Sequence, residues 1–200
     1  PLDSIVDESK VLPHLGVNWS LTDAQQLRVA ISQTVARPDF KETANAYFQD
    51  REFGAQVYGN PFLETSDIQN ADIRWEWYYD ESGEDSLSVA IFYKEFENAI
   101  ERVVIPASGT AANARSFRNS DVADLAGLEV EGRFSFEPFD TNNSEFFVDF
   151  NAAYIESEVE IGNGQTRAMQ GQPEYTANLI LGYDNFATGQ QLTLLINQNG

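Results

Sequence analysis

The sequence contains no cysteine and a single histidine, His14. Without cysteine the chain has no disulfide, thiolate nucleophile or zinc–thiolate site, and one histidine is too few for a histidine-based metal centre. No apolar run approaches the roughly 18 residues that a membrane-spanning helix requires. We therefore expect no disulfide, no spanning helix, no metal site and no cofactor.

Positive charge is also scarce. Lys and Arg total 12 against 32 Asp and Glu, which gives a formal net charge of −20. A nucleic-acid partner is excluded because the chain has no basic surface to neutralise phosphates, and electrostatic docking on anionic lipid is disfavoured for the same reason. Such acidity is typical of proteins exposed to salty water, including many extracellular surfaces.

Catalytic patterns are missing too. The sequence has no hydrolase nucleophile elbow, phosphate-binding loop or zinc-binding helix motif. Glu129 and Glu131 would share one face of a strand, as a pair of catalytic carboxylates does, but Arg133 beside them favours a solvated ion cluster. We predict that the protein is not an enzyme and has no catalytic residues.

What the chain does contain is alternation of apolar and polar residues with a period of two. Hydrophobic residues make up 42% and aromatic residues 12% of the sequence, too many for a disordered chain. Alternation predicts strands with two unlike faces, and no segment shows the period of a helix. The predicted strands are Val11–Trp19, Leu27–Val35, Ala71–Tyr79, Leu87–Lys94, Ala126–Phe136, Phe146–Tyr154, Tyr175–Tyr183 and Leu192–Ile196.

The connections between these strands alternate between short and long. The short ones are Ser20–Gln26, Asp80–Ser86, Glu137–Glu145 and Asp184–Gln190, and the long ones are Arg37–Ser66, Asn98–Ser120 and Glu156–Glu174. Up-and-down barrels of bacterial outer membranes have short periplasmic turns and long outer loops. The order predicts an all-β fold: an antiparallel up-and-down meander of about eight long strands in the wall of a transmembrane outer-membrane β-barrel.

The two faces of the predicted strands differ in charge. The apolar face contains no Asp, Glu, Lys or Arg, whereas a charge facing lipid at mid-depth would cost about 2–4 kcal/mol. The opposite face carries Arg28, Asp72, Arg74, Glu76, Glu129, Glu131, Arg133 and Asp149. Aromatic residues gather at the strand ends, as in the two interfacial girdles of a membrane barrel.

Two other folds also show alternation. One is an acidic, secreted or surface-displayed β-sandwich that binds glycans or calcium; the other is a complete eight-stranded outer-membrane protein. A sandwich would cover the apolar face with a second sheet, and a complete small barrel would pair its first strand with its last. The residues that distinguish the sandwich are Trp75, Trp77, Ile91, Val130 and Phe150.

Several segments resemble the barrel of TonB-dependent receptors. Leu27–Phe40 (LRVAISQTVARPDF) resembles the family strand that rises to a long loop, and Gly59–Glu64 is similar to the Gly-Asn-Pro-x-Leu element that brings the loop back. Further segments follow in the family's order: Ala71–Tyr79, Leu87–Glu101, Phe117–Arg133 and Gln170–Asp184. Together these matches cover nearly the whole chain.

The resemblance implies a transporter in the outer membrane of a Gram-negative bacterium that imports a scarce nutrient such as a metal chelate, cobalamin or an oligosaccharide. The family's barrel has about 22 strands and a plugged lumen. Since the sequence shows neither a plug domain nor a closing strand, we expect residues 1–200 to be a partial barrel domain, a fragment of a receptor. The implied partners are the TonB energising complex (through the missing plug segment with its TonB box), a small-molecule nutrient and outer-membrane lipid.

The loop Arg37–Ser66 is the candidate ligand-binding surface, because loops on a rigid scaffold commonly carry recognition. Its candidate residues are Tyr47, Phe48, Arg51, Phe53 and Tyr58. Aromatic rings and an arginine suit stacking on sugars or capture of an anionic chelate. The alternative is that these side chains pack the loop onto its neighbours.

Overall fold

The computed structural model describes residues 9–49, 56–79, 85–105, 114–137, 143–162 and 164–200. In this part of the chain all strands belong to one sheet, whose main path has the order β1-β2-β5-β6-β7-β8-β10-β11. These strands are β1 (His14–Thr22), β2 (Gln25–Ala36), β5 (Ser66–Tyr78), β6 (Ser86–Ile105), β7 (Ala114–Phe136), β8 (Ser144–Gly162), β10 (Tyr175–Asn185) and β11 (Gln190–Asn199).

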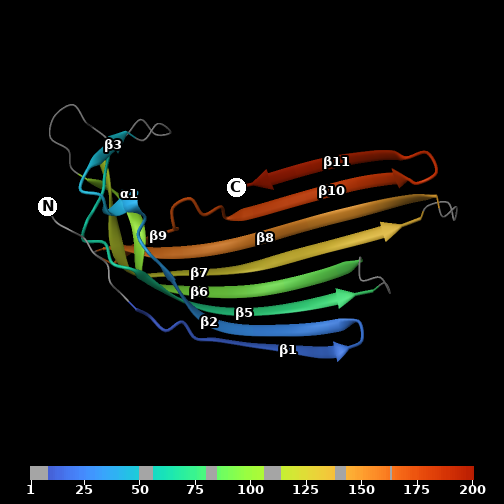
Figure 1. Ribbon diagram of the computed structural model, residues 1–200, viewed down its shortest axis with the longest axis horizontal. Coiled ribbons are helices and arrows are strands. Elements are labelled where there is room, and N and C mark those ends of the chain that lie inside the picture. The colour runs from blue at the N-terminus through green and yellow to red at the C-terminus, as the bar shows by residue number, and fades with distance from the viewer. Residues whose placement is uncertain (1–8, 50–55, 80–84, 106–113, 138–142, 163) are drawn as a thin grey trace.

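Every neighbouring pair along this path is antiparallel. Figure 1 shows one curved sheet with the short turns at one end and the long connections at the other. This confirms the predicted meander. The β2–β5 connection is long as predicted, whereas β6 ends at Ile105 and β7 begins at Ala114, so this link is hardly longer than the short one between β7 and β8. The β-sandwich is wrong for the described residues, which form a single sheet, and β1 and β11 lie at opposite edges without pairing, so the small closed barrel is wrong as well.

Three strands are much longer than predicted. β6, β7 and β8 have 20, 23 and 19 residues, so the segments expected as the long loops Asn98–Ser120 and Glu156–Glu174 are largely strand. At about 3.4 Å per residue β7 extends for roughly 75 Å, far more than the ~25 Å apolar band of a membrane barrel. The extensions were missed because charged residues interrupt the alternation there, while the backbone ladder continues.

The connection between β2 and β5 contains local structure that the sequence did not predict. It holds the short helix α1 (Phe40–Thr43) and the strands β3 (Tyr47–Gln49) and β4 (Gln56–Tyr58). The Asp39 N–H donates to the Glu42 carboxylate over 2.9 Å, the reciprocal contact of a capping box. No helix among the described residues is long and apolar enough to cross a membrane.

The short strands attach to the extensions of the long ones. β4 runs parallel to β7, with Gln56 opposite Ala114, and β3 pairs with β4. β9 (Gln165–Arg167) pairs with β8. These contacts build a second structured region beyond the long-connection end of the sheet (Figure 1).

Phenylalanine rings lie over glycines at three points of the sheet. The directly opposed pairs are Phe92 with Gly127, Phe150 with Gly132, and Phe147 with Gly182. A Cβ at each glycine would overlap ring atoms of its phenylalanine; at Gly132 it would lie 2.8 Å from the Phe150 ring. The missing side chain therefore lets each ring cover the neighbouring backbone, a device that pins strand register.

We expect Gly127→Ala to destabilise the protein by about 1–3 kcal/mol, because the new methyl overlaps the Phe92 ring and the packed sheet must shift. Urea unfolding in detergent measures the change. Adding Phe92→Ala removes the overlap, so Gly127→Ala should cost less in that background. Equal costs in the two backgrounds would contradict the packing explanation.

Candidate functional site

An exposed apolar band crosses one face of the sheet. One cross-strand row, in which each residue lies directly opposite the next, consists of Val17, Val29, Ile73, Ile91, Leu128, Tyr154 and Tyr175. All seven side chains are exposed, although they come from seven different strands. An apolar surface of this extent, covered by nothing in the described structure, marks a contact with a membrane or another apolar partner.

The edges of the apolar band run diagonally. On β2 the last apolar residue before the short turn is Leu27, whereas on β8 it is Phe146, three rows closer to the turns. At the edge near the long connections, the last apolar residue of the band is Tyr93 on β6 and Ile196 on β11. The row of Ile196 is again three rows closer to the short turns than the row of Tyr93. Three rows are about 20 Å along a strand and four strand spacings are about 19 Å, so the band lies at roughly 45° to the strands. Strands of membrane barrels tilt by about 35–45°.

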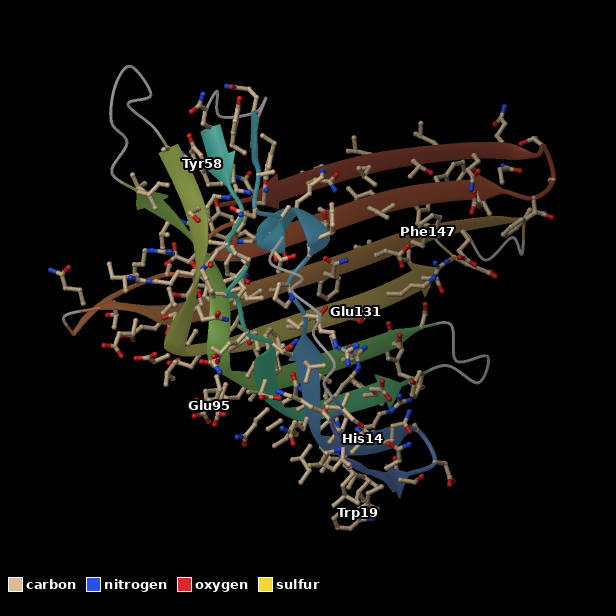
Figure 2. All side chains as sticks on the ribbon, turned by 60° about the vertical axis from the view of Figure 1, so that its left-hand side comes forward. His14, Trp19, Tyr58, Glu95, Glu131 and Phe147 are labelled. Carbon is tan, nitrogen blue, oxygen red and sulfur yellow. The ribbon has the colours of Figure 1, made fainter. Side chains whose placement is uncertain are left out.

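Aromatic rings collect at the short-turn edge of the band. Trp19 and Trp75 share a cross-strand row, and Trp77 occupies the next row. Ring contacts continue from Trp77 to Tyr79 (5.3 Å between centroids) and from Tyr79 to Phe134 (5.3 Å). Trp19 is seen at the β1 edge of the sheet in Figure 2.

The opposite face of the sheet carries a continuous polar belt. Directly opposed residues on eight strands form it: Ser20, Gln26, Glu76, Ser88, Glu131, Asn151, Asn178 and Asn197. Asn197 donates to Asn178 and Asn178 donates to Asn151, both over 2.7 Å. The charged face that the sequence predicted is therefore confirmed, and it is hydrogen-bonded from strand to strand.

Glu76 is the most enclosed charge in the polar belt, with a side chain 8% exposed. Its carboxylate accepts from Arg28 Nε at 3.0 Å and from Arg74 Nε at 2.9 Å. Arg74 also reaches Glu131 at 2.8 Å. Glu131 thus belongs to an ion-pair network, as expected, but its partner is Arg74; Arg133, the partner that the sequence suggested, pairs with Asp149 over 3.3 Å.

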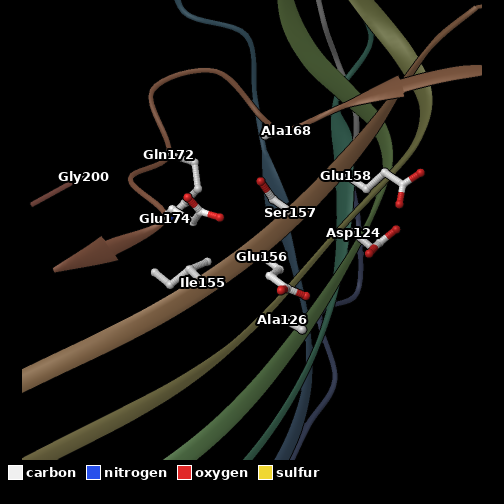
Figure 3. Close-up of a pocket in the computed structure, with 10 residues that line it drawn as sticks. All are labelled: Asp124, Ala126, Ile155, Glu156, Ser157, Glu158, Ala168, Gln172, Glu174 and Gly200. Atoms are coloured by element: carbon white, nitrogen blue, oxygen red, sulfur yellow. The ribbon is translucent and has the colours of Figure 1, made fainter.

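Just beyond the long-connection edge of the apolar band the surface turns acidic. Glu95, Asp124 and Glu158 are directly opposed on three neighbouring strands. Asp124 and Glu158 line a hollow of about 640 Å³ together with Glu156 and Glu174 (Figure 3). Opposed carboxylates are tolerated where water and salt screen them, so this edge belongs to an aqueous region. No cluster in the described part of the chain has the makings of a metal site.

The candidate ligand residues of the outer loop fall into three groups. Tyr47 and Tyr58 are directly opposed on β3 and β4, with ring centroids 5.9 Å apart, and are 68% and 36% exposed. Phe48 is half-buried against a cluster of Val57, Leu63 and Phe117. Arg51 and Phe53 lie outside the described residues.

Comparison with protein families identifies the family of the chain that carries these surfaces. A family model described as "TonB dependent receptor-like, beta-barrel" matches residues 3–198. The chain belongs to this family.

Solved receptor structures show the same fold as this TonB-dependent receptor chain. The siderophore receptor PirA from Acinetobacter baumannii gives a TM-score of 0.62 at 18% identity. A variant of the ferric enterobactin receptor PfeA from Pseudomonas aeruginosa, solved in complex with enterobactin, gives 0.62 at 20% identity. Each match covers 94% of this chain, which spans 28% of the solved chain's length. A comparison with curated proteins gives no match.

Two exposed aromatic residues of the TonB-dependent receptor loop were not among the sequence candidates. Phe40, at the start of α1, and Phe62, between β4 and β5, are 82% and 76% exposed. Phe62 belongs to the Gly59–Glu64 element that resembles the family, so its position was available from the sequence. The residues next to Phe62 in the sequence did not indicate that its ring is exposed to water.

We expect Glu76→Gln to lower the free energy of unfolding by about 1–3 kcal/mol, because both arginines lose their shared carboxylate in an enclosed position. Glu129→Gln is the matched control: it lies on the same face and has no ion-pair partner in the described part of the chain. Urea unfolding of the two variants compares them. A control that loses as much stability as Glu76→Gln would contradict the network's role.

Proposed function

We propose that the chain forms part of the barrel wall of an outer-membrane receptor of a Gram-negative bacterium that imports a small-molecule nutrient. The diagonal apolar band is the observation that carries the proposal. On β7 the band runs from Ala126 to Phe136, about 34 Å of strand, which a tilt near 45° reduces to about 25 Å. That height equals the hydrocarbon thickness crossed by outer-membrane barrels.

The other surfaces fit the same placement. The polar belt faces the barrel interior, where water and polar groups solvate charges at little cost. The extensions of β6, β7 and β8 then project beyond the outer leaflet, together with α1, β3 and β4. In this arrangement outer-membrane lipid is the partner of the apolar band, and the outer loop is the first part of the wall that an arriving nutrient meets.

For the nutrient we propose a metal chelate of the siderophore class, ahead of cobalamin or an oligosaccharide. The exposed pair Tyr47 and Tyr58 offers flat rings to a planar or aromatic ligand. Arg51, in the same loop, supplies the charge that an anionic chelate requires. Two of the similar structures are those of receptors named for siderophores, one of them solved with enterobactin.

Transport itself requires more than a wall. We propose that residues 1–200 are one part of a single barrel domain in a longer receptor, whose plug segment contacts the TonB energising complex. The chain's share of the solved receptors' length and the two unpaired edges, β1 and β11, support this arrangement. Import is then a property of the intact receptor. The wall formed by residues 1–200 contributes lipid contact and part of the ligand-binding surface.

Placement in the membrane predicts unequal costs for arginine on the two faces. Ile91→Arg puts a charge in the middle of the apolar band and should destabilise the receptor in lipid vesicles by about 2–4 kcal/mol. Ala90→Arg, on the opposite face between Arg74 and Glu129, should change stability by less than about 1 kcal/mol. Urea unfolding from vesicles measures the stability of both variants. Equal destabilisation by the two arginines would contradict the proposal that the apolar band contacts lipid.

Ligand recognition is tested at the tyrosine pair in the intact receptor, with ferric enterobactin as the probe. Changing Tyr47 and Tyr58 together to Ala should raise the Kd about tenfold, since both rings are lost as stacking surfaces. Arg51→Ala belongs to the same series, and Phe136→Ala, at the short-turn end, is the control. An unchanged Kd in the tyrosine variant would exclude the hairpin from binding this probe.

A further inference from the structure

The outer loop returns to the sheet through residues 59–64, here called the return limb. Two asparagine side chains attach this limb to the wall. Asn60 donates from Nδ2 to the Phe117 carbonyl on β7 over 3.0 Å, while its Oδ1 accepts from the Phe62 N–H over 3.0 Å. One side chain therefore both shapes the limb and anchors it.

Asn119, on β7, makes the second attachment. Its Oδ1 accepts from the Glu64 N–H over 2.9 Å and its Nδ2 donates to the Glu64 carbonyl over 3.0 Å. A neighbouring strand would offer Glu64 the same donor and acceptor, so the amide takes the place of a strand at this point. Nδ2 also donates to the Asn98 carbonyl over 2.8 Å.

The Asn98 carbonyl is available for this contact because the backbone departs from the regular ladder there. Asn98 has a φ of 57°, in the left-handed region that asparagine tolerates better than most residues. The β6–β7 register continues on both sides but skips Asn98. A residue that leaves the ladder on β6 thus supplies an acceptor to the asparagine on β7.

Apolar packing lies beside the two asparagines. Val57 on β4, Leu63 in the return limb and Phe117 on β7 form a buried cluster, against which Phe48 and Ile100 also pack. Val57 is fully buried and directly opposite Arg115 in the parallel pairing of β4 with β7. The hydrogen bonds therefore act on a limb that is also held by its side chains.

The outgoing half of the loop is attached to the return limb in turn. Gly59 donates its N–H to the Ala46 carbonyl and Asn60 donates its N–H to the Glu42 carbonyl, over 3.2 and 2.6 Å. Gly59 permits this contact because a Cβ there would overlap the carbonyl of Ala44. The connections lead from β7 through the return limb to β4 and β3, the hairpin that carries Tyr47 and Tyr58.

We propose that Asn119 and Asn60 are positioning residues that hold the β3–β4 hairpin as a fixed platform on β6 and β7, so that the two tyrosines are ordered before a ligand arrives. A platform ordered during folding has less conformational entropy to lose on binding than a loop that closes over its ligand. The inference rests on the proposed function in one respect, namely that the tyrosine pair is the ligand surface.

The mobility of the hairpin tests the platform without any ligand. The sequence has no cysteine, so a nitroxide on Gln49→Cys reports from β3 alone once cysteines elsewhere in the receptor are replaced by serine. We expect an immobilised spectrum in the intact receptor and an added mobile component with Asn119→Ala. Asn119→Asp keeps the acceptor for the Glu64 N–H but places a carboxylate oxygen against the carbonyl oxygens of Glu64 and Asn98, so its mobile component should be no smaller than that of Asn119→Ala.

Asn178→Ala is the matched control. Asn178 also makes two side-chain hydrogen bonds between strands, but in the polar belt far from the loop, so the nitroxide spectrum should not change. Circular dichroism verifies that each variant keeps its sheet. A spectrum that stays immobilised in a folded Asn119→Ala receptor would overturn the platform.

Affinity for ferric enterobactin separates this inference from the proposed function. We expect Asn119→Ala to weaken binding about three- to tenfold, and the tyrosine double variant to weaken it as well. Lost affinity in the tyrosine variant alone would overturn preorganisation by Asn119. A mobile hairpin with unchanged affinity in both variants would support the attachment and overturn the recognition role of the tyrosines.

Discussion

β6 and β7 keep one antiparallel register from Ser86 opposite Arg133 to Ile105 opposite Ala114. In an apolar slab every backbone N–H and C=O needs a partner within the sheet, so this ladder is obligatory wherever the strands meet lipid. It also fixes which side chains face which way, because a slip of one residue would exchange the two faces. The apolar band, the polar belt and the outer platform are all placed by this one register.

The two faces of the sheet pair their residues by different physical means. Rings and branched side chains fill the apolar face, where the Phe150 ring covers the backbone at Gly132. The two other phenylalanine–glycine pairs, Phe92 with Gly127 and Phe147 with Gly182, lie on the polar face. On the polar face charges are shared between strands, as Glu76 shows with its two arginines. Each face stabilises the same strand order, so neither alone has to specify the fold.

Sequence alone was sufficient for the part of the chain that carries the apolar band, because one apolar face and one polar face require strict alternation. It was insufficient beyond the long-connection edge of the band. There β6 carries Glu95, Glu97 and Glu101 at positions that would continue the apolar face, so the alternation is lost although the ladder continues to Ile105. Tyr47 and Tyr58 were found as candidates because aromatic residues in a polar loop stand out, whereas the role of Asn119 depends on a contact with Glu64, 55 residues away.

All three tryptophans of the chain, Trp19, Trp75 and Trp77, lie within two adjacent rows of the apolar band. Intrinsic tryptophan emission from these 200 residues therefore comes from one small patch near the short turns. Its wavelength would respond to insertion of the wall into lipid, and brominated acyl chains would quench it at that depth. Tryptophan emission from this patch would not respond to ligand binding at the β3–β4 hairpin. Insertion into lipid can therefore be measured by fluorescence independently of ligand binding.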